Sequence, residues 1–161
     1  MLKRLTATFQ KIEDIVLVSL LLIMIFMAVI QIFLRNFFDS GILWADPLVR
    51  VLVLWLGLVG AMAASRTDNH ISIDVISRFL PGHIKGFTQT LVYLFTSGIT
   101  GLMAWHSYRF VCMEKADGLM AFAGAPAWVC EAIIPAAFAV ISLRYALFFL
   151  DQMISLFRAK P

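Results

Sequence analysis

Three histidines are the residues of this chain best suited to hold a redox cofactor. A haem held between membrane helices needs two imidazoles that face each other across the bundle. His106 falls in a long apolar stretch, whereas His70 and His83 fall in a polar loop. This spacing argues against haem ligation. His106, close to aromatic residues, is more typical of a polar residue at a membrane interface.

The two cysteines, Cys112 and Cys130, lack the C-x-x-C spacing of metal and redox sites. The sequence also shows no Glu-x-x-His pair, no nucleophile beside a base and no glycine-rich phosphate loop. We therefore predict no catalytic, cofactor-binding or metal-binding residues, and a protein that is not an enzyme. A structural disulfide stays an alternative, because both cysteines are expected near one membrane face.

Three arginines lie in or beside apolar stretches, where a charge is costly. Arg109 and Arg144 are close enough to the ends of their stretches to extend toward the headgroups. Arg50 follows Asp46 by four residues, which is one helical turn, so the two are predicted to form an ion pair beside Trp44. The alternative is a solvated pair at the interface with no further role.

The composition indicates an integral membrane protein. Hydrophobic residues make up 61% of the 161 residues and charged residues 14%, which leaves little polar surface to cover a soluble core. Mean hydropathy is +0.90. The net charge is +3, and the basic residues are scattered rather than aligned in a stripe, so nucleic acid is not an expected partner.

Four apolar stretches reach or approach the roughly 20 residues that a helix needs to cross a bilayer. They are residues 15–34, 47–64, 87–111 and 133–150. Long uniform runs predict helices rather than barrel strands, so the fold class is an all-α membrane protein of one domain, residues 1–161. The first stretch lacks a small-residue cleavage pattern and is predicted to be retained. Asp46 is predicted to cap the second helix, with Pro47 as its first residue.

Lysines and arginines outside the stretches predict the orientation. Most lie before the first stretch, between the second and third, and after the fourth. By the positive-inside rule both termini and the middle loop are cytoplasmic. Trp44, Trp105, Tyr108 and Trp128 are expected in an aromatic belt at the outer headgroups, which agrees with this topology.

The middle loop is predicted to contain a short amphipathic helix, about residues 70–80, lying in the cytoplasmic interface. Its apolar side chains share one side of a helical projection, and His70, Asp74 and Arg78 fall on the other. Asp74 and Arg78 are also spaced for an i, i+4 pair. A flexible loop is the alternative.

Small residues are predicted to form two helix-packing surfaces. The second stretch carries Gly57, Gly60, Ala61 and Ala64, and the third carries Gly98 and Gly101 beside Ser97. Spacing leaves open whether they contact this chain or a partner. No repeat of interrupted helices indicates a substrate site at the membrane midplane.

Several segments taken in order resemble the small membrane subunit, the DctQ-like small permease, of tripartite ATP-independent periplasmic (TRAP) transporters. They are Gln31-Ile32-Phe33-Leu34-Arg35-Asn36, Trp44-Ala45-Asp46-Pro47-Leu48-Val49-Arg50, Trp55-Leu56-Gly57-Leu58-Val59-Gly60-Ala61 and His70-Ile71-Ser72-Ile73-Asp74. Later matches are Gly124-Ala125-Pro126-Ala127-Trp128, Ile134-Pro135 and Arg144. Family members often have two adjacent acidic residues after the first tryptophan, whereas here Pro47 follows Asp46.

The resemblance implies a multi-pass protein of the bacterial inner membrane that works with two partners besides the lipid bilayer. A large membrane subunit would carry the substrate and sodium sites, and a periplasmic solute-binding protein would deliver an organic anion such as a carboxylate or sugar acid. This chain would be the fixed scaffold of a symporter. Trp44, Asp46, Arg50 and Trp55 are the expected contacts with the other components.

Two other classes stay open from the sequence. An independent channel or exporter would need polar residues lining a shared face, and such a face is not found. A membrane anchor for a redox enzyme would need haem or quinone ligands.

Overall fold

The computed structural model describes residues 2–39, 41–66 and 82–158. The elements are α1 (Leu2–Phe38), α2 (Ala45–Ala64), α4 (Gly82–Asp117), β1 (Met120–Phe122), β2 (Ala125–Pro126), α5 (Ala127–Glu131) and α6 (Ile133–Arg158). The predicted interfacial helix, with His70, Asp74 and Arg78, lies outside the described residues and stays a prediction.

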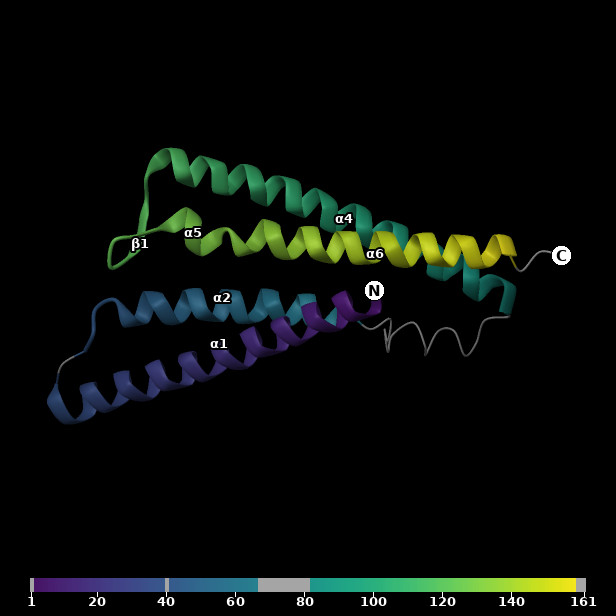
Figure 1. The fold of residues 1–161 in the computed structure, drawn as a ribbon. Coiled ribbons are helices and arrows are strands. Elements are labelled where there is room, and N and C mark those ends of the chain that lie inside the picture. The colour runs from purple at the N-terminus through teal and green to yellow at the C-terminus, as the bar shows by residue number, and fades with distance from the viewer. Residues whose placement is uncertain (1, 40, 67–81, 159–161) are drawn as a thin grey trace.

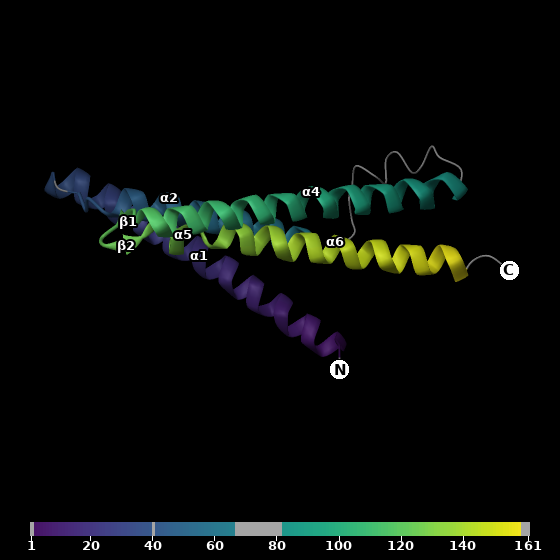
Figure 2. The same ribbon diagram turned by 90° about the horizontal axis from the view of Figure 1, so that it is seen from above.

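The long helices form a row rather than a closed bundle. They follow one another in the order α4, α6, α2 and α1 (Figure 1). Seen from above, α1 diverges from the other helices toward its N-terminus (Figure 2). We call the end that holds residues 41–44 and 118–126 the loop end of the row, and the end at Arg66 the Arg66 end. A row leaves two broad faces and both edge helices uncovered.

α1 extends well beyond the predicted span 15–34 at both ends, because no glycine or proline interrupts residues 2–38. It ends where Asp39 takes a positive φ of 45°, a conformation uncommon for residues other than glycine. The chain then turns back into α2, which packs along α1 (Figure 1). Much of the apolar surface of α1 stays exposed.

α4 and α6 form the most extensive helix pair, and hydroxyl groups join them. Ser97 Oγ donates to the backbone oxygen of Ser142 at 3.1 Å, and Ser142 Oγ donates to the backbone oxygen of Ser97 at 2.9 Å. A Cβ added at Gly101 would lie 3.2 Å from Ser142 Oγ. The absence of a side chain at Gly101 therefore allows this close approach.

Aromatic rings fill the space between α4 and α6 on the Arg66 side of these serines. Tyr93 is 2% exposed and packs against Tyr145 and Phe148, with ring centroids 6.3 and 5.9 Å away. Met62 of α2 reaches the same cluster. The core therefore joins three of the four long helices.

At the loop end a two-stranded hairpin leads into the short helix α5. β1 and β2 are antiparallel, and Gly124 has a φ of +81° at their turn. Cys130 in α5 is buried and Cys112 in α4 is exposed, and both are free thiols, so the alternative of a disulfide between them is not realised.

Three helical segments in the described part of the chain are long and apolar enough to cross a membrane: Thr8–Phe38, Ala45–Ala64 and Ala127–Ser155. They contain the first, second and fourth predicted spans. The third predicted span, residues 87–111, is helical within α4, but hydroxyl and glycine residues lower its hydropathy below that of the others. The four-span count therefore stays a prediction.

We predict that Gly101→Leu lowers the thermal stability of the detergent-solubilised protein. The new side chain would force α4 away from Ser142, and overpacking of this kind costs about 1–3 kcal/mol. Gly57→Leu is the matched control, because a Cβ at Gly57 meets nothing within 4 Å and both variants gain the same helix propensity. Equal melting temperatures for the two variants would contradict the close packing at Gly101.

Candidate functional site

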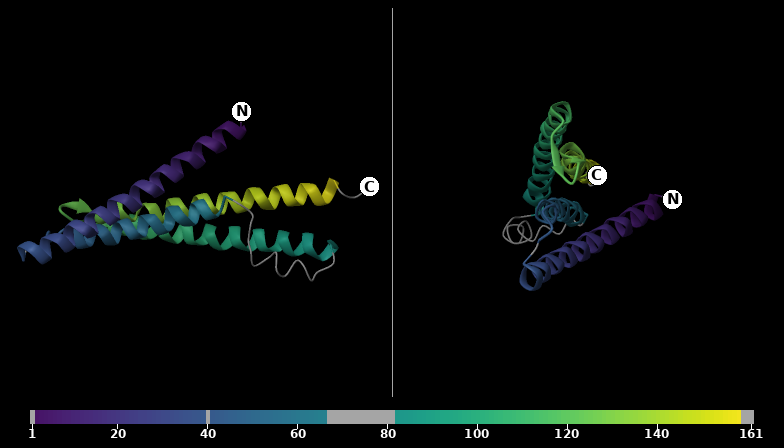
Figure 3. Two further views of the ribbon diagram at one scale, coloured as in Figure 1. Left: turned by 90° about the horizontal axis from the view of Figure 1, so that it is seen from below. Right: turned by 90° about the vertical axis from the view of Figure 1, so that its left-hand side faces the viewer.

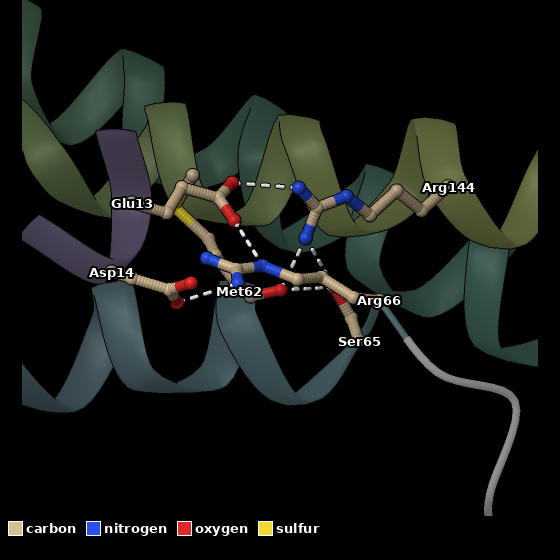
Figure 4. Close-up of polar contacts among 6 residues, drawn as sticks. All are labelled: Glu13, Asp14, Met62, Ser65, Arg66 and Arg144. Carbon is tan, nitrogen blue, oxygen red and sulfur yellow. Dashed lines mark hydrogen bonds and ion pairs between the residues drawn. The ribbon is translucent and has the colours of Figure 1, made fainter. Parts of the chain in front are cut away.

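Four charged side chains from three parts of the row meet at the Arg66 end, and we call them the four-charge network: Glu13, Asp14, Arg66 and Arg144 (Figure 4). Glu13 of α1 accepts from two guanidinium groups. Its Oε1 lies 2.6 Å from Arg144 Nη2 of α6, and its Oε2 lies 2.5 Å from Arg66 Nε, just beyond α2. Asp14 Oδ1 lies 2.6 Å from Arg66 Nη1. One carboxylate therefore joins three elements far apart in the sequence.

Arg144 also binds the end of α2. Its Nη1 donates to the backbone oxygen of Met62 and to Ser65 Oγ, the latter at 3.1 Å. Ser65 Oγ in turn donates to the same Met62 oxygen at 2.7 Å. Carbonyls in the last turn of a helix lack helical partners and carry the negative end of its dipole. Arg144 thus adds a charged donor to a last-turn carbonyl that Ser65 also binds, and it fixes α6 against the end of α2.

The network is electrically balanced, with two carboxylates and two guanidinium groups, which lowers the cost of burying it. Glu13 is 5% exposed, whereas the side chain of Asp14 is 60% exposed. Burial lowers the pKa of Arg66, but hydrogen bonds from its guanidinium to Asp14 and Glu13, and their charges, raise it, and the pKa ends above its ordinary value. Arg66 is therefore held firmly in its charged form.

Sequence reasoning did not find this network. Arg144 was expected to extend toward the headgroups, and it binds Glu13 instead. Two signals were available: an acidic pair directly before an apolar stretch, and an arginine within the last apolar stretch, where a charge needs a partner. Neither signal identifies the partner, because residues 13 and 144 are brought together only by the order of the helices in the row.

A second polar cluster lies at the loop end, between α1 and α2. The Gln31 side chain accepts from Ile42 N at 3.2 Å and donates to Ile42 O at 3.3 Å, so it pairs with the backbone of the turn. Asp46 lies 3.2 Å from Arg35 Nη2 and 3.4 Å from the Gln31 amide. These groups, with Asp39, line a surface cavity of about 320 Å³.

This cluster corrects two predictions about Asp46. α2 begins at Ala45 with Trp44 in the cap position, and no side chain caps it, so Asp46 lies in the first turn instead of capping the helix. Its carboxylate there still complements the positive end of the helix dipole. The predicted ion pair with Arg50 is wrong, since Asp46 pairs with Arg35 across the turn.

The other expected contact residues lie apart from one another. Trp44 is 43% exposed at the loop end, and Arg50 is exposed on α2 with no ion pair among the residues the structure describes. Trp55 is directed into the row, where its Nε1 donates to the backbone oxygen of Cys130 at 2.8 Å. Trp55 thus joins α2 to α5 within this chain.

The small residues of α2 divide between two sides. A Cβ at Gly60 would lie 3.9 Å from Leu17 of α1, so Gly60 faces that helix. Gly57, Ala61 and Ala64 are exposed. On α4, Gly101 faces Ser142, whereas Gly98 meets nothing within 4 Å. The two predicted packing surfaces are therefore each only partly used within the chain.

The side chains of the four-charge network and the Gln31–Asp46 cluster cross-link helices. Within residues 2–39, 41–66 and 82–158, no three His, Cys, Asp or Glu side chains gather closely enough to hold a metal ion. Both clusters make ion pairs and hydrogen bonds between elements. Such an arrangement can set the positions of helices.

We predict that Glu13→Gln destabilises the protein by about 3–5 kcal/mol, the usual cost of removing one partner of a buried ion pair. Asp14→Asn is the control and should cost less than about 1 kcal/mol, because the Asp14 side chain is largely exposed. Chemical unfolding in detergent, followed by tryptophan fluorescence, would compare the two. Similar midpoints for both variants would show that Glu13 does not hold the row together.

Comparison with known proteins identifies the family. The sequence model described as "Tripartite ATP-independent periplasmic transporters, DctQ component" matches residues 24–155. A putative TRAP transporter small permease protein of Haemophilus influenzae is 31% identical over 81 residues, half of each chain. The C4-dicarboxylate TRAP transporter small permease protein DctQ of Pseudomonas aeruginosa is 27% identical over 108 residues, 64% of this chain and 51% of the relative.

A further relative is larger. The sialic acid TRAP transporter permease protein SiaT of Haemophilus influenzae is 34% identical over 64 residues, which are 40% of this chain and 10% of that protein. The chain thus spans about half the length of the small permease relatives and a tenth of this permease. Because the family model covers most of the sequence, the chain belongs to the DctQ components of the tripartite ATP-independent periplasmic transporters, a family of transporter subunits rather than enzymes.

Proposed function

We propose that this chain is a non-catalytic scaffold that holds a large membrane permease in the bilayer during uptake of an organic anion. The observation that carries this proposal is the way the described helices use their buried polar groups. Glu13, Arg144 and Ser142 each bond one element of the row to another. A fixed row of this kind suits a subunit that positions a moving partner.

The longer relative supports a large permease as the partner. In the sialic acid permease, a sequence similar to this one makes up a tenth of a single chain. A segment like two fifths of this chain therefore occurs within one much longer permease chain. We propose that here the same association is made without a covalent link, by contact within the membrane.

We propose that the chain crosses the bacterial inner membrane four times with both termini in the cytoplasm. α2 has 20 residues and would span about 30 Å at 1.5 Å per residue, which matches the hydrocarbon core of a bilayer. The Arg66 end then lies at the cytoplasmic interface, where the positive-inside rule favours it. α4, paired along α6, would be the fourth span.

We propose a carboxylate or sugar acid as the transported anion, coupled to sodium entry. Relatives are named for sialic acid and for C4-dicarboxylates, and both substrates carry carboxylate groups. The substrate and sodium sites would lie in the large permease. At the loop end, Trp44, Asp46 and Arg50 would help to dock a periplasmic binding protein, with Asp46 held in place by Arg35.

Purification of the chain from its native membrane in mild detergent tests the scaffold. We expect a much larger multi-span protein in near equal amount. A lone chain or a homo-oligomer, under conditions that keep known membrane complexes intact, would contradict the proposal.

We predict that Arg50→Ala lowers anion uptake about threefold to tenfold in proteoliposomes that hold both membrane subunits, because loss of an exposed charge weakens docking of the binding protein. Lys11→Ala, an exposed charge toward the other end of the row, is the control and should leave uptake unchanged. Uptake is measured with a radiolabelled carboxylate, the binding protein and an inward sodium gradient. Normal uptake by Arg50→Ala would exclude a docking role for this residue.

A further inference from the structure

We propose that α4 is the helix that contacts the large permease, and that a membrane helix of that subunit places a carboxylate against Arg109. α1, at the other edge of the row, would face lipid. This inference rests on the proposed function, since it needs a large permease as partner. It adds which surface of this chain the partner occupies and what chemistry the partner must present.

The first step is the depth of Arg109 in the membrane. Ser97 of α4 lies opposite Ser142 of α6. Ser142 is two residues from Arg144, which binds Glu13 at the Arg66 end. At 1.5 Å per residue, Arg109 lies about 18 Å along α4 from Ser97 toward the loop end, and His106 about 14 Å. A hydrocarbon core is about 30 Å thick. With α4 as the proposed fourth span, both residues lie inside the hydrocarbon core, and Arg109 lies nearer its outer boundary.

The second step is the lack of a partner for these side chains. His106 and Arg109 are exposed on α4, and neither has a hydrogen bond or ion pair with another described residue. Facing lipid, Arg109 would have to extend to the outer headgroups or stay unpaired in hydrocarbon, whereas a facing carboxylate would pair with it where it lies. Charged groups inside membranes usually face protein or water rather than lipid tails.

The third step is that these groups share one stripe of α4. Gly98, Leu102, His106 and Arg109 follow at intervals of four, four and three residues, which places them on one side of a helix. Gly98 has open space where a side chain would be. A partner helix can therefore approach closely at one end of the stripe and pair with Arg109 at the other.

α1 has the opposite character. Residues 15–34 carry no charged side chain, and exposed apolar groups such as Leu22 and Phe26 line a shallow cavity of about 540 Å³ on it. Such a surface can face lipid at no electrostatic cost. α1 and α4 lie at opposite edges of the row (Figure 3, right). The two edges therefore meet different surroundings, and the charge on α4 distinguishes them.

Site-specific photo-crosslinking in the co-expressed complex tests the surface. A benzophenone side chain would replace Leu102 of α4 or Leu22 of α1, which are 62% and 61% exposed and so form a matched pair. We expect a covalent product with the large permease from position 102 and none from position 22. A product from position 22 alone, or from neither position while the permease still co-purifies, would overturn the assignment to α4 and leave the scaffold function standing. If no permease co-purifies, both proposals fail.

A substitution tests the charge. Arg109→Leu should lower the amount of large permease recovered with the chain by about threefold to tenfold, because one intramembrane polar contact is lost. Membrane insertion of the chain itself should be unchanged, since the new side chain is apolar. Equal or greater recovery with Arg109→Leu would show that Arg109 makes no bond to the partner and would overturn this part of the proposal.

Discussion

The arrangement of the helices depends on the position of one carboxylate, Glu13, between the guanidinium groups of Arg66 and Arg144. α1 packs along α2, and apolar contacts alone would allow a helix to slide or rotate. Ion pairs with defined donor directions oppose sliding and rotation of the helix, because each guanidinium must keep its planar geometry with the carboxylate. Glu13 therefore sets the register of α1, and Arg144 carries that register to α6.

The membrane explains why hydroxyl groups and an indole make the remaining connections. Lipid tails are as apolar as leucine side chains, so helices gain little by hiding apolar surface from them, and close packing and hydrogen bonds decide their association. Ser97 and Ser142 join α4 to α6 with reciprocal bonds. Trp55 joins α2 to the backbone of α5 at the loop end. Each connection also satisfies a polar group that would be costly to leave unpaired in hydrocarbon.

A row of helices has a consequence for function that a closed bundle lacks. Its two broad faces and two edges remain uncovered by this chain, which suits the scaffold role proposed above. The stability of such a row must come from contacts between neighbours in the row, since no central core is shared by all four helices. Polar cross-links from two levels of α1, at Glu13 and at Gln31, supply part of this stability.

Apolar stretches and loop charges in the sequence predicted a helical membrane protein. Ordered motifs around Trp44, Trp55 and Arg144 identified the family. Both predictions were possible because hydropathy and motifs are properties of short segments of sequence. Three of the predicted spans coincide with helices apolar enough to cross a membrane. Pairing was decided only by the tertiary structure. Asp46 could have bound Arg50 one turn away, yet the turn after α1 brings Arg35 to it. Glu13 and Arg144 are separated by most of the sequence, yet their side chains form an ion pair. The order of the helices in the row brings them to the same level, and no local sequence pattern encodes that order.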